Sequence, residues 1–215
     1  MKLNTILFDL DGTLTDPKVG ITESVRYAMA QMKRPLSPQT NIDWCIGPPI
    51  QENFAKLLQT DDTTQIEQSI AFYRERFGKQ GIYENELYAG IPEVLATLQN
   101  HGLHLYIATS KPHVYAREIL AEFDLTPYFL EVYGSELDGR NANKAHLIQY
   151  IIQTESLNPT TTLMVGDREH DIIGGKANHT YTAGVAYGYG SVEELQNAGT
   201  DYIFHTPQEI QLLAK

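Results

Sequence analysis

Two aspartates, Asp9 and Asp11, directly follow a short apolar run, Thr5 to Phe8. The run predicts a buried strand, and Gly12-Thr13 behind it is a turn signal. Side chains two residues apart on an extended chain share a face, so we expect the two carboxylates to converge. Carboxylates that close repel each other unless a cation or a proton lies between them, and magnesium prefers oxygen ligands. The stretch therefore predicts a magnesium site, with a polar turn after a strand as the simpler alternative.

Further side chains that can do chemistry stand beyond the carboxyl ends of later predicted strands: Thr109, Lys144, Asp167 and Asp171. In open parallel sheets, ligands bind at this edge. Each residue has an ordinary explanation when taken alone, because hydroxyls cap helices, lysines are usually solvated and carboxylates favour helix N-termini. Together they would assemble a nucleophile, an acid/base, a hydroxyl donor, a cation and a metal ligand.

The elements that must position these groups fall into two blocks. Residues 16 to about 82 show helical spacing of apolar residues, which predicts four helices, over 19–34, 37–44, 50–58 and 66–77. From residue 88 strands and helices alternate, and the chain ends in a final helix. This alternation predicts an α/β fold with a doubly wound parallel sheet. We therefore expect a core domain of residues 1–15 and 83–215, with a helical domain of residues 16–82 inserted into it.

The composition of the chain argues against several classes of binding partner. Against 16 Lys and Arg stand 27 Asp and Glu, a formal net charge of -11, which disfavours a nucleic acid polymer. One cysteine, Cys45, permits no internal disulfide and no cysteine-based zinc site. The chain shows no signal peptide and no apolar run long enough for a membrane span. We expect a cytoplasmic protein, as a monomer or a homodimer, with no membrane partner.

The chain resembles the haloacid dehalogenase superfamily, in its phosphatase branch with a helical cap. Four motifs spread over essentially the whole chain carry the resemblance: Asp9-Leu10-Asp11-Gly12-Thr13, Ala108-Thr109-Ser110-Lys111-Pro112, Lys144, and Gly166-Asp167-Arg168-Glu169-His170-Asp171. The sequence is also similar to the phosphoglycolate phosphatase-like group, whose members include 5'-nucleotidases. Ile46-Gly47-Pro48-Pro49 and Tyr187-Gly188-Tyr189-Gly190 support that subgroup, although a helix linker and a tight turn would explain them equally well.

The resemblance implies a phosphatase that requires Mg²⁺ and acts on a small phosphorylated metabolite through an aspartyl-phosphate. In this scheme Asp9 is the nucleophile, and Asp11 is first the acid and then the base. The Asp9 carboxylate, the Asp11 backbone carbonyl and Asp167 would hold the metal, and Asp171 would orient Lys144 or a metal-bound water. The residues implied in binding the phosphate are Gly12, Thr13, Thr109, Ser110 and Lys144.

Three alternatives follow from the same residues. A dehalogenase is disfavoured, because a halide leaving group needs no proton and Asp11 is present. A phosphomutase of the beta-phosphoglucomutase type would share the aspartyl-phosphate but protect it from water. A catalytically silent phosphate-binding module is the third alternative, and the presence of Asp9 and Lys144 counts against it.

Overall fold

The computed structural model describes residues 3–214, and the chain forms two compact units. The first comprises the described residues up to Asp16 and from Leu87 onward, and the second is Pro17–Glu86. The chain therefore leaves the first unit soon after Asp9 and Asp11 and returns to it 70 residues later. Within residues 3–214, no helix is both long enough and apolar enough to cross a membrane.

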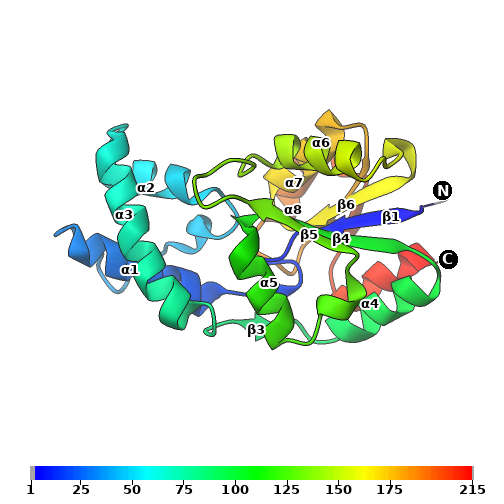
Figure 1. Ribbon diagram of the computed structural model, residues 1–215, viewed down its shortest axis with the longest axis horizontal. Helices are drawn as coiled ribbons and strands as arrows, with labels where there is room; N and C mark the ends of the chain where they lie inside the picture. Colours follow the sequence, from blue (N-terminus) through cyan, green and yellow to red (C-terminus); the bar gives the residue numbers. More distant parts are fainter. Residues whose placement is uncertain (1–2, 215) are drawn as a thin grey trace. The chain divides into compact units, whose positions relative to one another are not determined.

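The first unit is built on a six-stranded sheet in the order β5-β4-β1-β6-β7-β8, in which the paired strands run parallel (Figure 1). Helices cover it on both sides, with α6 and α7 on one face and α4 and α5 on the other. This arrangement confirms the predicted α/β class with a doubly wound parallel sheet. The strands are β1 (Thr5–Phe8), β4 (His104–Pro112), β5 (Glu131–Ser135), β6 (Thr162–Gly166), β7 (Tyr181–Val185) and β8 (Tyr202–Phe204).

Five α-helices belong to this unit: α4 (Ile91–Asn100), α5 (His113–Glu122), α6 (Lys144–Thr154), α7 (Glu169–Ala177) and α8 (Val192–Asn197). Short 3₁₀ segments complete it: η3 (Thr126–Tyr128), η4 (Pro159–Thr161) and η5 (Pro207–Ala214). The final helix predicted from the sequence is therefore a 3₁₀ segment rather than an α-helix. Side chains three apart eclipse one another in this geometry, which makes such segments uncommon beyond a turn.

β1 lies in the middle of the sheet and is buried on both faces, which explains its unbroken apolar sequence. On one face Leu7 packs with Met164 of β6 and with apolar residues of α6. On the other, Phe8 meets Phe129 edge to face, with ring centroids 6.3 Å apart. Phe8 is in register with Ile107 of β4 and Val165 of β6. Phe8, Ile107 and Val165 thus lie at one level, where β1 ends and β6 ends one residue later, whereas β4 continues past it to Pro112 and includes Thr109.

The second unit is helical: α1 (Lys18–Gln31), η1 (Asp43–Cys45), α2 (Ile50–Leu58), α3 (Thr63–Arg76) and the π-helical turn η2 (Phe77–Gly81). Its core contains Tyr73, stacked on Phe77 and edge to face with Phe54. Gly20 of α1 allows close packing on η2, because an added Cβ would lie 2.0 Å from the Gly81 carbonyl oxygen. The short strands β2 (Thr15–Asp16) and β3 (Glu86–Leu87) pair where the chain passes between the units.

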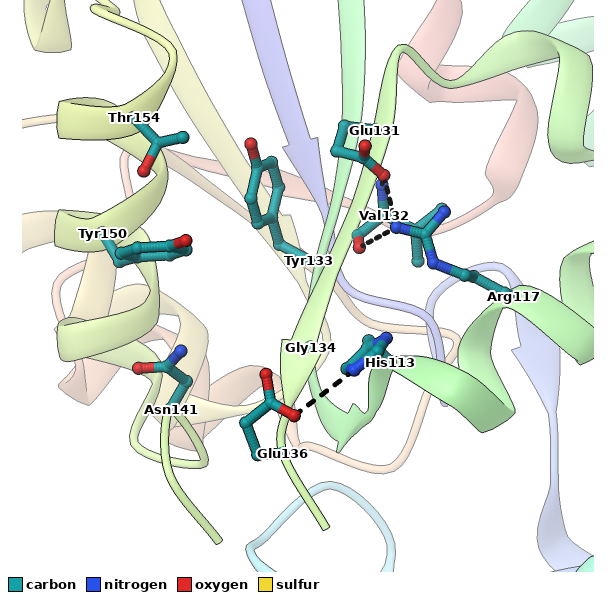
Figure 2. Close-up of a pocket in the computed structure, with 10 residues that line it drawn as sticks. All are labelled: His113, Arg117, Glu131, Val132, Tyr133, Gly134, Glu136, Asn141, Tyr150 and Thr154. Atoms are coloured by element: carbon teal, nitrogen blue, oxygen red, sulfur yellow. Dashed lines mark hydrogen bonds and ion pairs between the residues drawn. The ribbon is translucent and has the colours of Figure 1, made fainter. Parts of the chain in front are cut away.

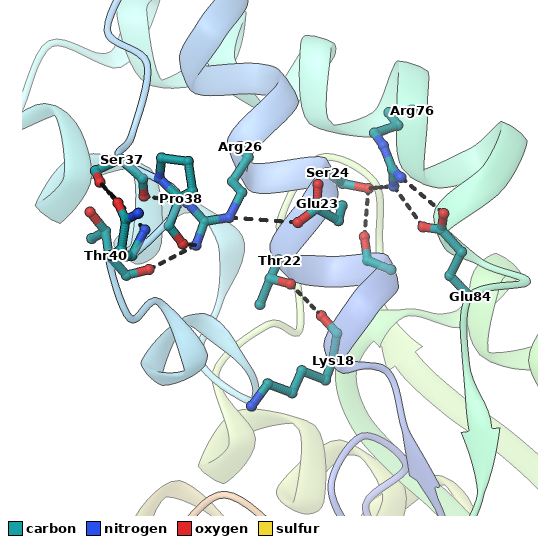
Figure 3. Close-up of polar contacts among 12 residues, drawn as sticks. Lys18, Thr22, Glu23, Ser24, Arg26, Ser37, Pro38, Thr40, Arg76 and Glu84 are labelled. Carbon is teal, nitrogen blue, oxygen red and sulfur yellow. Dashed lines mark hydrogen bonds and ion pairs between the residues drawn. The ribbon is translucent and has the colours of Figure 1, made fainter.

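The helix predicted over 37–44 is wrong, since the structure has no helix there before the short η1. The carbonyls of Ser37, Pro38 and Thr40 instead accept hydrogen bonds from the guanidinium of Arg26 on α1 (Figure 3). A carbonyl that is satisfied by a side chain gains little from helix formation. The segment therefore folds around the Arg26 side chain. The spacing of apolar residues in the sequence does not reveal this contact.

Asp201 joins β7 to the segment before β8, and we expect Asp201→Asn to lower stability at pH 7 by about 1–2 kcal/mol. Its carboxylate accepts from Lys176 Nζ and from the backbone and hydroxyl of Thr182, at 2.9 and 3.0 Å. Partial burial alone would raise the Asp201 pKa, but these hydrogen bonds outweigh it and lower the pKa.

Because the folded-state pKa lies below the unfolded value of about 3.9, this stabilisation is complete above that value. It is lost as the pH falls through the lower folded-state pKa. Urea unfolding of wild type and Asp201→Asn from pH 7 to pH 2 should therefore show two curves that converge in acid. Glu122→Gln, at an exposed position of α5, is the control and should leave stability unchanged. A pH-independent difference between wild type and Asp201→Asn would contradict the prediction.

Candidate active site

Lys144 connects two of the aspartates predicted for the site. Its ammonium lies 3.1 Å from Asp9 Oδ1 and 2.7 Å from Asp171 Oδ1, and it donates to the Ala108 carbonyl at 2.7 Å. Lys144 is the first residue of α6, and the Asn143 side chain caps that helix by accepting from His146 N. The capped helix start thus holds a buried lysine against the end of β1. Burial would lower the Lys144 pKa, but Asp171 and Asp9 outweigh it and raise the pKa.

Asp167 lies opposite Asp9, at the end of β6, and is fully buried. Its Oδ2 accepts from the Tyr189 backbone at 2.7 Å, whereas Oδ1 has no hydrogen-bond partner among residues 3–214. Burial, together with the nearby Asp171 and Asp9 carboxylates, raises the pKa of Asp167 well above its ordinary value. Burial contributes most to this shift, and the two neighbouring carboxylates add to it.

Asp9, Asp167 and Asp171 are also the group that fits a metal ion, since each offers an oxygen and these atoms lie within 4.8 Å of one another. Oxygen ligands suit Mg²⁺ and Ca²⁺ better than softer metals. The orphaned Asp167 Oδ1 supplies a buried acceptor with nothing yet to accept from. The residues present therefore fit a hard divalent cation.

Asp11 is buried beside Asp9 and is paired with a different lysine. Lys111 Nζ lies 3.0 Å from Asp11 Oδ2, and both side chains are less than a tenth exposed. Burial raises the Asp11 pKa, and the Lys111 ammonium opposes the shift without cancelling it. Together with Lys144, Asp9, Asp167 and Asp171, this pair makes up all the buried charged side chains of residues 3–214.

The remaining predicted site residues lie at the same edge of the sheet, with one difference. Thr109 is buried, and its hydroxyl accepts from the Lys111 backbone at 3.3 Å. Thr13 is fully buried in the turn after Asp11, with no hydrogen-bond partner for its hydroxyl in the described chain. Ser110 instead directs its hydroxyl to the Ala142 carbonyl at 3.0 Å, so its side chain is occupied in holding the loop before α6.

Glycines let the backbone pack directly against Asp167. An added Cβ on Gly12 would lie 2.2 Å from Asp167 Oδ2, and one on Gly190 would lie 2.0 Å from the Asp167 backbone oxygen. Gly188, between them in space, would place a Cβ 2.4 Å from the Asp167 Cβ. Gly12 also has φ of +79°, a conformation that residues with a side chain rarely adopt. The loop 187–190 is thus more than a tight turn, because it packs against Asp167.

Sequence reasoning gave no role to Lys111 or to Tyr189. A pattern in the sequence does point to Lys111, because it stands two residues after Thr109 on an extended segment and therefore shares its face. Tyr189 contacts Asp167 through its backbone, which no side-chain pattern reveals. Its hydroxyl also donates to Asp16, the last residue before the chain leaves this unit.

A cavity of about 220 Å³ lies beside β5, and none of the six buried charged residues lines it (Figure 2). Its charged residues are paired with one another: His113 faces Glu136 at 3.4 Å, and Arg117 contacts Glu131 at 2.6 Å. Arg117 also donates to the Val132 carbonyl, which blocks part of the exposed edge of β5. Such contacts shield an edge strand from pairing with another chain.

The chain is similar to known proteins in both sequence and structure. Residues 6–185 match the family model described as haloacid dehalogenase-like hydrolase. A 5'-nucleotidase of Pseudomonas aeruginosa is 43% identical over 91% of this chain and 88% of its own. The tyrosine-protein kinase PtkA of Mycobacterium tuberculosis is 32% identical over 93% of this chain and 68% of its own. The crystal structure of a predicted phosphatase from Clostridium acetobutylicum superposes with a TM-score of 0.95, at 39% identity over 99% and 98% of the two chains.

Alanine variants of two glycines with nearly equal φ can distinguish the effect of backbone strain from the effect of a collision with Asp167. Gly12 (+79°) and Gly102 (+80°) share the left-handed conformation, but an added Cβ at Gly102 meets nothing within 4 Å. Gly102→Ala should lose about 1–2 kcal/mol of stability from backbone strain alone, and Gly12→Ala should lose more, because its Cβ also collides with Asp167. In addition, Gly12→Ala should abolish the rise in melting temperature on addition of Mg²⁺, because its Cβ displaces Asp167. Thermal unfolding with and without Mg²⁺ measures this, and an equal Mg²⁺ effect in both variants would contradict it.

Proposed function

Because the chain belongs to the haloacid dehalogenase-like hydrolase family, we propose that it hydrolyses small phosphomonoesters through an aspartyl-phosphate on Asp9, with Mg²⁺ as cofactor. The observation that carries the proposal is that all six buried charges of residues 3–214 lie together at the carboxyl edge of the sheet. Four are carboxylates and two are lysines, so the cluster has an excess of two negative charges when ionised. Buried charge of this kind is costly, and a divalent cation would balance it.

Asp9 is the nucleophile in this proposal. Its Oδ1 accepts from the Leu10 backbone at 2.8 Å and faces Lys144 at 3.1 Å, so the carboxylate is held at a fixed angle. We assign attack on phosphorus to the other oxygen, Oδ2. The Asp9 and Asp167 carboxylates and the Asp11 backbone carbonyl would hold Mg²⁺, which reduces the repulsion between the anionic nucleophile and the anionic phosphoryl group.

Lys144 and Thr109 are assigned to the phosphoryl oxygens, where charge is spread in the transition state. The Ser110 backbone N–H would add a donor in place of the Ser110 hydroxyl, which is already used. The backbone N–H groups of Gly12 and Thr13 donate to the Thr15 and Leu10 carbonyls, so they could bind phosphate only by giving up those bonds. Asp171 keeps Lys144 in place through the 2.7 Å contact. Asp11 gives its proton to the leaving oxygen and then takes one from the water that attacks the aspartyl-phosphate.

The substrate class is the least constrained part of the proposal. The relative named 5'-nucleotidase supports a nucleotide-type monoester, and a phosphoglycolate-type monoester stays possible on the sequence resemblance. The acidic balance of the chain, -11, argues against a nucleic acid polymer. We propose that residues 16–82 act as a cap that selects small substrates. A cytoplasmic location and a monomeric or homodimeric state remain predictions.

Asp9→Asn should reduce phosphate release from a nucleoside 5'-monophosphate by at least about 10⁴-fold. The amide keeps the shape of the side chain but is a poor nucleophile towards phosphorus. Initial rates of phosphate release measure the effect, and borohydride trapping of acyl phosphate, read by mass spectrometry, should label residue 9 in wild type alone.

Asp138→Asn is the matched control, because it makes the same chemical change on an exposed side chain. Its rate should equal that of wild type. Phosphate release by Asp9→Asn at the wild-type rate would remove Asp9 from the nucleophile's role. Transfer of the phosphoryl group to a second hydroxyl in place of water would redirect the proposal to a phosphomutase.

Removal of Mg²⁺ should stop turnover and also lower stability. Without the cation, the Asp9, Asp167 and Asp171 carboxylates repel one another in a buried site. Dialysis against EDTA followed by activity and melting-temperature measurements tests both effects, and added Mg²⁺ should restore them. Full activity after exhaustive chelation would refute the metal assignment.

A further inference from the structure

Lys111 is the second of the two buried lysines of residues 3–214, and the proposed mechanism assigns it no role. Its side chain is 6% exposed, and its ammonium lies 3.0 Å from Asp11 Oδ2. Lys144, the other buried lysine, lies against Asp9 and Asp171 instead. Each of the two aspartates assigned to chemistry therefore has its own lysine.

The backbone is built to aim this side chain. β4 leaves its regular register with β5 between Ala108 and Pro112, and such irregularities re-aim the side chains within them. Lys111 lies inside this stretch. Its carbonyl oxygen approaches Gly134 of β5 so closely that an added Cβ there would be 2.4 Å away. The sheet irregularity and the glycine on the neighbouring strand thus both set the backbone path at Lys111.

The two oxygens of Asp11 are not equivalent as a result. Oδ2 faces the Lys111 ammonium, whereas Oδ1 is buried and has no hydrogen-bond partner among residues 3–214. An unsatisfied buried oxygen is costly. Such a cost is expected at an atom whose partner arrives with the substrate.

We infer that Lys111 is a positioning residue that holds Asp11 through Oδ2 and leaves Oδ1 to exchange the proton with the ester oxygen. This inference rests on the proposed function. In the first step an Asp9 oxygen forms a bond to phosphorus while the bond from phosphorus to the ester oxygen breaks. The electron pair of that bond stays on the ester oxygen, which takes the proton from Asp11. Negative charge then develops on Asp11 beside the Lys111 ammonium, which stabilises it.

Substrates that differ in their need for this proton test the inference. A nucleoside 5'-monophosphate has an alkoxide leaving group that must be protonated, whereas p-nitrophenyl phosphate releases a stable anion. Lys111→Met should lower kcat/KM for the nucleotide by about 100-fold and for the aryl ester by less than about 3-fold, mainly through kcat. Lys111→Arg should recover most of the loss, and Arg140→Met, at an exposed cation outside residues 16–82, should leave the ratio unchanged.

A double variant shows whether Lys111 acts through Asp11. In an Asp11→Asn background, Lys111→Met should change the nucleotide rate by less than about 3-fold, because the coupled effects are not additive. Circular dichroism checks folding, and Lys111→Gln, which keeps a donor without the charge, replaces Lys111→Met if that variant does not fold.

Two further outcomes would contradict a positioning role for Lys111, and two would contradict the proposed function. An equal loss on both esters, with weaker inhibition by inorganic phosphate, would make Lys111 a phosphate ligand and overturn the inference. No loss on either ester would overturn it as well. If wild type hydrolyses neither ester, or if Asp9→Asn is as active as wild type, the proposed function itself fails, and this inference falls with it.

Discussion

The cost of burying charge governs this structure. Four carboxylates and two lysines are buried at one edge of one sheet, and no other charged side chain of residues 3–214 is buried. Each buried ion carries a desolvation penalty of several kcal/mol unless partners offset it. The lysines offset part of it, with Lys144 between Asp9 and Asp171 and Lys111 beside Asp11. The negative excess that remains would be balanced by a divalent cation, which we propose to be Mg²⁺.

The backbone geometry follows from the need to crowd carboxylates without placing apolar atoms between them. Parallel register brings the ends of β1 and β6 to the level of Ile107 in β4, and β4 carries Thr109 and Lys111 just beyond it. Glycines then let chain segments touch the acids directly, as at Gly12 against Asp167 and at Gly166, where an added Cβ would lie 2.1 Å from Asp171. These glycines do not contribute chemistry themselves. They remove the side chains that would hold the reactive groups apart.

Features encoded in neighbouring residues could be predicted from the sequence. The alternation of strands and helices from residue 88 was enough for the fold class, and the four motifs were enough for the family and for a phosphatase, all of which are confirmed. Features set by distant contacts could not. Arg26 draws the segment 37–41 away from a helix, and the Tyr189 backbone supports Asp167 from 22 residues away. Apolar spacing carries no information about such donors.

The two lysines illustrate why a motif assigns roles only in part. Lys144 stands at a capped helix start, and three oxygens hold it, from Ala108, Asp9 and Asp171. An ammonium fixed in this way can stabilise charge on the nucleophile and on the phosphoryl group. Lys111 comes from a strand irregularity and faces Asp11, the carboxylate that we propose as the acid and base. Two equal charges therefore reach the site from different elements and contact different carboxylates. In the proposed mechanism, phosphoryl binding and proton transfer would each depend on its own lysine.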